Sequence, residues 1–179
     1  MVKIVVLIGV AGSGKTTVGT MLADAMHCAF LEGDSLHSAA NVEKMSHGIP
    51  LTDADRAPWL GAIHARMLDS FTRGVCLVVG CSALKRAYRT VLADGIPITC
   101  VYLKGSAALI RSRLQRRSGH YMKTEMLASQ FEALEEPSDA LIVDVSQPPR
   151  TIVERILAEL RRSTHADMAG STDRRKGDA

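Results

Sequence analysis

The sequence has few aromatic residues and little net charge. Aromatics make up 4% of its 179 residues, and 22 Lys and Arg against 19 Asp and Glu leave a formal net charge of +3. A nucleic-acid-binding domain needs a dense basic face and aromatic side chains on which bases stack. The composition therefore argues against a nucleic-acid partner.

The sequence also lacks the patterns of a membrane protein and of a zinc protein. Its first apolar run, residues 4–8, lies between Lys3 and Lys15 and is far too short to cross a bilayer, so we expect neither a spanning segment nor a signal peptide. No H-E-x-x-H motif occurs, and the four cysteines contain no C-x-x-C pair. We expect reduced thiols in a cytoplasmic protein, and no zinc site.

Apolar runs alternate with helical patterns along most of the chain. Five runs are apolar throughout, as is typical of parallel strands buried on both faces, at 3–8, 29–31, 75–79, 98–103 and 141–145. Helical patterns lie at 15–26, 38–46, 53–73, 84–93, 106–117, 123–135 and 149–162. The alternation predicts an α/β fold, a three-layer sandwich with a five-stranded parallel sheet. We expect one domain over 1–162 and a disordered tail over 163–179, which is polar and without periodicity.

The loop after the first strand has the complete phosphate-binding pattern G-x-x-x-x-G-K-[ST]. It consists of Gly9, Val10, Ala11, Gly12, Ser13, Gly14, Lys15 and Thr16. Backbone amides around the glycines can turn toward a phosphate because no Cβ blocks the bend, and the following helix adds its positive end. Lys15 supplies a charge for the β- and γ-phosphates, and the Thr16 hydroxyl is placed to ligate Mg²⁺. The loop predicts a protein that binds a nucleoside triphosphate.

Candidate acceptor-binding residues follow the second predicted strand. Asp34 is expected across the cleft from the phosphate-binding loop, where a carboxylate can accept a proton from an attacking hydroxyl; the alternative is a helix cap. His37 could hydrogen-bond a polar substrate. Arg56 either clamps an anionic substrate or pairs with Asp53 or Asp55, and spacing alone does not choose between these roles.

Further candidates follow the third predicted strand. Ser82 is expected at its carboxyl end, and Lys85 and Arg89 lie four residues apart on one helix face, which reaches either the active site or solvent. No aspartate ends this strand, which shifts magnesium binding to Thr16 and Asp34.

A basic segment at about 111–125 suits a helical lid. Arg113, Arg116 and Arg117 could neutralise charge on a transferred phosphoryl group, although some arginines here would simply be solvated. After the fifth strand, Gln147 and Pro148 are candidates for the adenine edge.

Several blocks of the sequence resemble the gluconate kinase family of phosphate-loop kinases. The resemblance covers residues 4–160 and is carried by residues 9–16, Gly33-Asp34-x-x-His37, Pro50-Leu51-x-Asp53-x-Asp55-Arg56, Cys81-Ser82-Ala83-Leu84-Lys85 and Gly119-His120. Glu32 stands where an aspartate is usual in the family.

The resemblance implies ATP- and Mg²⁺-dependent phosphorylation of D-gluconate at its 6-hydroxyl. It implies a fold of the nucleoside monophosphate kinase type with a lid, and members of the family are often dimers. Lys15 and Asp34 would act in catalysis with the lid arginines, and the acceptor would meet a set of residues comprising Asp34, His37, Arg56, Ser82, Lys85, Arg89 and His120. The alternatives are a kinase for another small hydroxylated acid, such as shikimate, and a regulatory domain that binds ATP without turnover.

Overall fold

The centre of the molecule is a parallel β-sheet, as the apolar runs predict. The structure, a computed structural model, describes residues 3–116 and 124–173. Over these residues the five strands are β1 (Ile4–Ile8), β2 (Ala29–Glu32), β3 (Leu77–Gly80), β4 (Ile98–Lys104) and β5 (Leu141–Asp144). All pairings are parallel, and the order across the sheet is β2-β3-β1-β4-β5. The predicted α/β architecture is confirmed.

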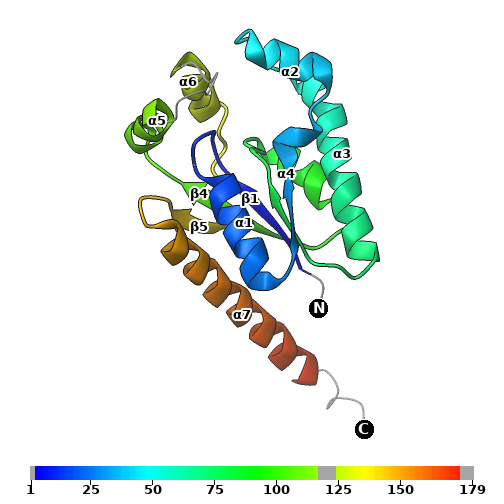
Figure 1. The fold of residues 1–179 in the computed structure, drawn as a ribbon. Helices are drawn as coiled ribbons and strands as arrows, with labels where there is room; N and C mark the ends of the chain where they lie inside the picture. The colour runs from blue at the N-terminus through cyan, green and yellow to red at the C-terminus, as the bar shows by residue number, and fades with distance from the viewer. Residues whose placement is uncertain (1–2, 117–123, 174–179) are drawn as a thin grey trace.

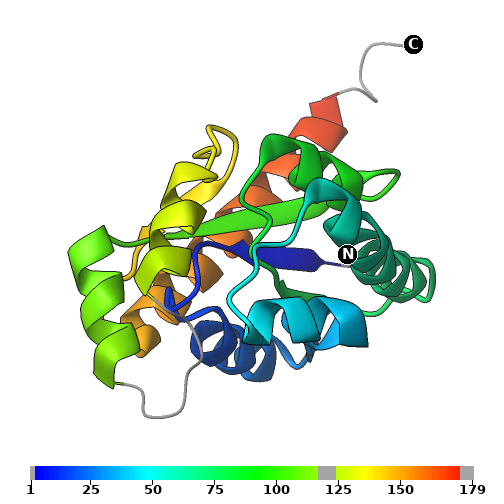
Figure 2. The same cartoon turned by 90° about the horizontal axis from the view of Figure 1, so that it is seen from above.

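Helices cover both faces of this sheet. In chain order they are α1 (Lys15–Met26), α2 (Ala39–Ser46), α3 (Asp53–Thr72), α4 (Arg86–Ala93), α5 (Ala107–Arg116), α6 (Thr124–Glu132) and α7 (Pro149–Asp173). Helices α1 and α7 pack on one face, and α3 and α4 on the other (Figure 1). Seen from above, α5 and α6 lie on one side of the loop after β1, and α2 lies on the other (Figure 2). The carboxyl ends of the strands therefore open between two helical flanks.

Every residue of β1 is buried, and its side chains belong to two hydrophobic clusters, one on each face of the sheet. Val5 and Leu7 pack against the α1 and α7 side, whereas Ile4, Val6 and Ile8 pack against the α3 and α4 side. Successive side chains of a strand point to opposite faces, so one apolar strand serves both halves. This buried central strand fixes the loop that follows it. None of the described helices is long and apolar enough to span a membrane.

Two segments differ from the expectation. A short 3-10 helix, η1 (Gly33–Leu36), follows β2 directly, where the sequence predicted only a loop. Helix α7 continues to Asp173, beyond residue 162, where we expected the ordered domain to end. Extending a formed helix costs little compared with nucleating one, so a polar sequence without periodicity can prolong it.

Cys28 and Cys76 form a disulfide, so the expectation of reduced thiols was wrong for these two residues. Their Cα atoms lie 5.2 Å apart, although 48 positions separate them in the sequence. Ala29 of β2 pairs with Leu77 of β3, which brings the residues preceding the two strands side by side. The pairing depends on strand order, which cysteine spacing does not reveal.

Candidate active site

The phosphate-binding loop joins β1 to α1 through two left-handed glycines. Gly12 has φ +81° and Gly14 has φ +98°, a region that glycine adopts without steric cost. Lys15 opens α1, and its Nζ donates to the carbonyl oxygens of Gly9 and Val10, at 2.9 and 3.1 Å. Burial lowers the pKa of this ammonium, while Asp34 and other nearby acidic groups act in the opposite direction. A buried cation thus lies beneath the loop.

A cavity of about 310 Å³ opens beside this loop and fits the expected nucleotide site. Its wall includes Gly12, Ser13 and Gly14 of the loop, together with Arg113, Arg116 and Gln147. Arg113 Nη2 also donates to the carbonyl oxygen of Val145 at 2.5 Å, which fixes the guanidinium at the cavity. Pro148 is not part of the wall, and its carbonyl accepts from the N–H of Ile152 in α7.

An acidic residue lies beside Thr16 that the sequence analysis did not assign. The Thr16 hydroxyl donates to Glu32 Oε2 at 2.5 Å. Glu32 ends β2 and pairs in register with Gly80, the last residue of β3. The neighbouring strand therefore supplies the carboxylate that β3 lacks. The sequence feature that could have identified Glu32 is its position directly before Gly33-Asp34.

Thr16 and Glu32 are suited to a metal that is also held by phosphate. Hydroxyl and carboxylate oxygens are the ligands that Mg²⁺ prefers. Among the described residues, no group of three or more His, Cys, Asp and Glu side chains could hold a metal. The protein thus offers a partial oxygen set, as in kinase sites where substrate phosphates complete the coordination.

A second cavity, of about 140 Å³, lies on the acceptor side and collects four predicted residues. Asp34, His37, Arg56 and Ser82 all line it. The remaining lining residues, which the sequence analysis did not assign to the site, are Met45, Pro50, Leu51, Trp59, Ser129 and Gln130. A carboxylate, a guanidinium and a hydroxyl thus share one small pocket with apolar walls.

Trp59 supports two elements of this pocket. Its indole stacks on the His37 ring with 4.3 Å between centroids and 13° between planes. Its Nε1–H donates to the carbonyl oxygen of Gly33 at 2.8 Å, next to Asp34. Burial lowers the pKa of His37, with Asp34 opposing this shift and Arg56 reinforcing it. The fold therefore favours the neutral imidazole.

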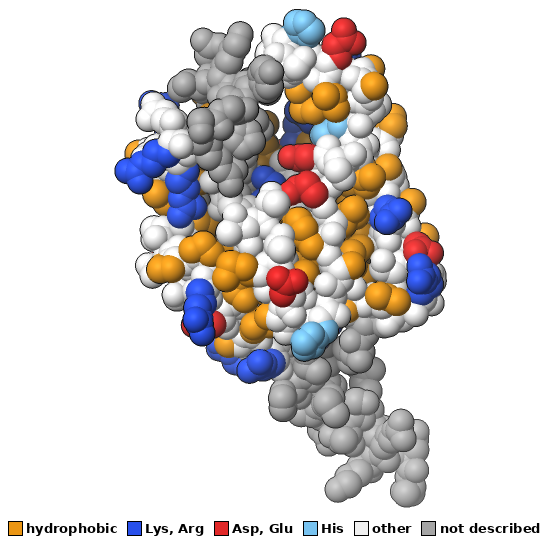
Figure 3. Space-filling view, viewed as in Figure 1, with side chains coloured by type: hydrophobic (Ala, Val, Ile, Leu, Met, Phe, Trp, Pro, Cys, Tyr) orange, Lys and Arg blue, Asp and Glu red, His pale blue; other side chains and the backbone are white. Residues whose placement is uncertain are grey.

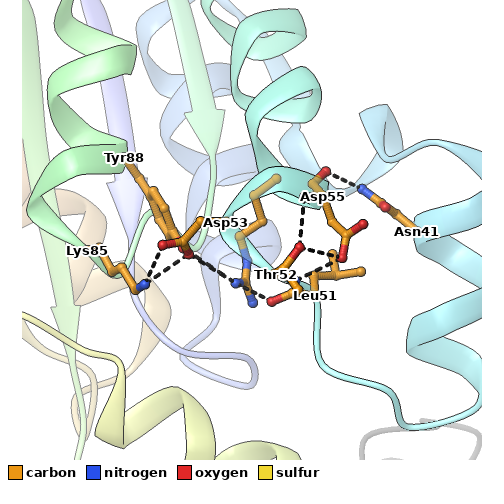
Figure 4. A network of polar contacts seen from close by, with 8 residues as sticks. Asn41, Leu51, Thr52, Asp53, Asp55, Lys85 and Tyr88 are labelled. Atoms are coloured by element: carbon orange, nitrogen blue, oxygen red, sulfur yellow. Dashed lines mark hydrogen bonds and ion pairs between the residues drawn. The ribbon is translucent and has the colours of Figure 1, made fainter.

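Asp53 is the centre of a network of polar contacts next to Arg56 (Figure 4). Lys85 Nζ lies 2.9 Å from both its carboxylate oxygens, and the Tyr88 hydroxyl donates to it. Arg56 Nη1 donates to the Leu51 carbonyl at 2.6 Å and lies 4.0 Å from Asp53 Oδ1. Hydrogen bonds from Tyr88 and then Lys85 lower the pKa of Asp53. Arg56 is thereby held at the pocket with its charge partly compensated.

The structure does not bring every expected substrate residue to the acceptor pocket. Lys85 pairs with Asp53 and does not line the cavity. Arg89 donates to the carbonyl oxygens of Ala83 and Leu84, at 3.2 and 2.9 Å, and lines a different surface groove. Helix α4 begins only at Arg86, so these two side chains leave different elements instead of one helix face.

Arg117 and His120 lie outside the described residues.

In the space-filling view, basic side chains gather over the α5 side, and acidic side chains lie beside the hollow between the two helical flanks (Figure 3).

The chain is similar to known kinases over most of its length. A family model described as an AAA domain matches residues 4–141. The thermoresistant gluconokinase of Escherichia coli K12 is 46% identical over 165 residues, covering 89% of this chain and 94% of that protein. A gluconokinase of Gluconobacter oxydans is 45% identical over 159 residues, covering 87% and 89%.

A solved structure gives the same result for the fold. The crystal structure of a gluconokinase from Sinorhizobium meliloti 1021 matches with a TM-score of 0.84 and 42% identity, covering 94% of this chain and 97% of that one. Identity of this extent over nearly complete chains shows the relationship, and the chain belongs to the gluconokinase family.

Proposed function

We propose that the protein transfers the γ-phosphoryl group of ATP to the 6-hydroxyl of D-gluconate, giving 6-phospho-D-gluconate and ADP. The observation that carries this proposal is the pair of cavities beside the phosphate-binding loop. The first is lined by residues of the loop and by two arginines, and the second is lined by Asp34, Arg56 and Ser82. Gluconokinases from two bacteria, each at least 45% identical, support gluconate as the acceptor.

Lys15 and Asp34 have different roles in the transfer: Lys15 binds phosphate, and Asp34 acts on the acceptor hydroxyl. Lys15 exchanges the neutral carbonyls of Gly9 and Val10 for the β- and γ-phosphate oxygens of ATP, which are stronger partners in a buried site. Asp34 orients the acceptor hydroxyl and accepts its proton as the phosphorus–oxygen bond forms. Burial lowers the pKa of Lys15, and the nearby Asp34 opposes that shift.

The acceptor pocket discriminates by charge and polarity. Arg56 binds the gluconate carboxylate through its guanidinium. Neutral His37 and Ser82 hydrogen-bond the hydroxyl groups, and Arg113 and Arg116 stabilise charge on the transferred phosphoryl group. Arg117 and His120 are assigned to the lid on the strength of the sequence alone.

Mg²⁺ is part of the proposal because the residues present fit it. Thr16 Oγ1 and Glu32 Oε2 are adjacent hard oxygens at the loop. When bound, the ion would neutralise phosphate charge. We further propose a cytoplasmic location, where ATP is supplied, and a homodimer.

An acceptor panel tests the proposal. The protein is incubated with ATP, Mg²⁺ and gluconate, shikimate or other sugar acids, and ATP consumption is measured with coupling to 6-phosphogluconate dehydrogenase. We expect consumption that depends on gluconate. Turnover with another acid alone contradicts the substrate, and ATP binding without turnover for any acceptor indicates a regulatory domain.

Asp34→Asn tests the proposed base. We expect kcat to fall about 100-fold or more, with little change in the KM for ATP, because the amide cannot accept the proton. Asp69→Asn, an exposed carboxylate paired with Arg73 on α3, is the matched control. Undiminished turnover of Asp34→Asn removes this residue from the mechanism.

A further inference from the structure

Gln130 on α6 contacts the phosphate-binding loop and lines the acceptor pocket. Its Oε1 accepts from the backbone N–H of Ala11 in the phosphate-binding loop at 2.7 Å, across 119 positions of sequence. The same side chain lines the acceptor pocket with Asp34 and Ser82. The side chain of Gln130 therefore links the phosphate-binding loop to the acceptor pocket.

The helices of this flank are fixed against both sides of the site. On the loop side, Leu114 and Ile110 of α5 pack so closely at Gly12 that a Cβ there would lie 2.9 Å from Leu114 Cγ. On the acceptor side, the chain leaving α6 is tied to the residues after β3. Glu135 donates its N–H to the Leu84 carbonyl at 3.0 Å, and its carboxylate accepts from the N–H of Arg86 at 2.6 Å. Gln130 thus projects from α6, which is tied to the acceptor side through Glu135, while the neighbouring α5 packs on the loop.

The chemistry of a primary amide suits this place. Its oxygen accepts and its NH₂ group carries two donors. The oxygen is occupied by Ala11, and the NH₂ group makes no hydrogen bond within the described part of the chain. Donors beside the acceptor pocket suit the hydroxyl and phosphoryl oxygens that meet during transfer.

We propose that Gln130 is a positioning residue that sets the loop at Ala11 relative to the acceptor pocket, so that the phosphoryl group reaches the acceptor and not water. This inference rests on the proposed kinase function. A displacement of reacting groups by about 1 Å can cost about 100-fold in rate, so one hydrogen bond to the loop is enough to matter. Loss of the contact leaves ATP bound but misaligned.

Gln130→Met tests the inference, because methionine keeps the length of the side chain without its amide. We expect kcat with acceptor to fall about 10-fold or more, with little change in the KM for ATP. The ratio of ADP formed to phosphorylated acceptor formed should rise above that of wild type. Glu132→Gln, an exposed residue on the same helix, is the matched control and should keep the wild-type ratio.

Amide hydrogen exchange gives a second readout that needs no acceptor. In the free protein, the Ala11 amide should exchange about 10-fold faster in Gln130→Met than in wild type, while amides of β1 keep their protection. Unchanged exchange at Ala11 overturns the contact. Faster exchange with an unchanged product ratio overturns the positioning role, and so does a lower melting temperature with an unchanged ratio. Failure of wild type to phosphorylate gluconate overturns the proposed function instead, and leaves the exchange result to be judged separately.

Discussion

His37 stacks on an aromatic ring, so its protonation can be followed directly. Trp59 is the single tryptophan of the chain, and it stacks on the imidazole. Because burial lowers the pKa of His37, we expect its protonation midpoint below 6.5. A cationic ring quenches a stacked indole, so the fluorescence of Trp59 should fall as pH decreases through that midpoint.

The control for this titration separates His37 from the other histidines. His37→Asn should abolish the transition, whereas His64→Asn, on α3 facing the Leu92 carbonyl, should leave it in place. A wild-type midpoint above 6.5 would show that Asp34 outweighs burial. In that case the protonated His37 ring would be a second cation in the pocket beside Arg56, and it would also attract the acceptor carboxylate.

At the residue scale, the sequence predicts which candidate residues lie near one another better than it predicts the residues that support them. The phosphate-binding loop, Asp34, Arg56 and Ser82 could be placed near one edge of the sheet because strand ends meet there. Glu32 was missed because its partner Thr16 is distant in sequence and meets it only through the pairing of β2 with β3. Trp59 and Gln130 act through contacts that span 26 and 119 positions, and no local pattern reveals them.

At the element scale, two helical glycines should respond to alanine in opposite directions. A Cβ at Gly19 of α1 would lie 2.2 Å from Phe30 of β2, whereas a Cβ at Gly61 of α3 would meet nothing within 4 Å. We expect Gly19→Ala to lower the free energy of unfolding by about 1–3 kcal/mol through overpacking. Gly61→Ala should raise it by about 0.5–1 kcal/mol through helix propensity. Chemical denaturation of both variants measures this, and a stabilising Gly19→Ala would refute the packing of α1 on β2.

The start of α3 is stabilised by a charge that can be titrated. Asp55 forms a capping box with Thr52, and Lys44 of α2 lies 2.7 Å from its carboxylate. The hydrogen bond from Lys44, followed by those from Thr52, lowers the pKa of Asp55 from 3.8 to about 2.

A carboxyl whose pKa is lower in the folded state stabilises the fold above its unfolded pKa. That contribution is lost as pH falls from about 4 to about 2. Asp55→Asn should therefore be less stable than wild type at neutral pH, and the difference should shrink over this interval. Urea denaturation at several pH values measures it; a difference that does not change with pH would show that the charge of Asp55 contributes nothing.

Most elements could be predicted from the sequence, because continuous apolar runs and helical periodicity are local properties. Except at the C-terminal end of α7, the predicted strands and helices lie within a few residues of their observed bounds. The sequence did not predict η1, a single 3-10 turn whose Gly33 carbonyl accepts a hydrogen bond from Trp59 of α3. Such a turn depends on tertiary contact and leaves no periodic pattern in four residues.

At the scale of the whole molecule, one covalent link joins the edge of the sheet to its neighbour. The Cys28–Cys76 disulfide closes a loop with a sequence separation of 48 residues. A loop of this length is expected to stabilise the fold by about 2–4 kcal/mol, mainly by restricting the unfolded chain.

Cysteine variants test that link. Without reductant, Cys28→Ser, Cys76→Ser and the double variant should all lose about the same stability. With reductant, the stability of wild type should fall to that of these variants. Cys100→Ser removes an unpaired cysteine, so its stability should change with reductant by the same amount as that of wild type. Equal stability of wild type with and without reductant would show that the disulfide does not form in solution.

The overall architecture brings the two cavities together at the carboxyl ends of the strands. A buried central strand presents the phosphate-binding loop (Figures 1 and 2). Arg113 and Arg116 of α5 line the cavity beside this loop, and residues of η1, of α3 and of the segment after β3 line the acceptor pocket.

Phosphorus NMR of the complete reaction tests this account most directly. The protein is mixed with ATP, Mg²⁺ and gluconate, and all phosphorus species are followed together. We expect one new phosphomonoester signal for each ADP formed, coincident with authentic 6-phosphogluconate, and almost no inorganic phosphate. Inorganic phosphate without the phosphomonoester, or unchanged ATP, would contradict it.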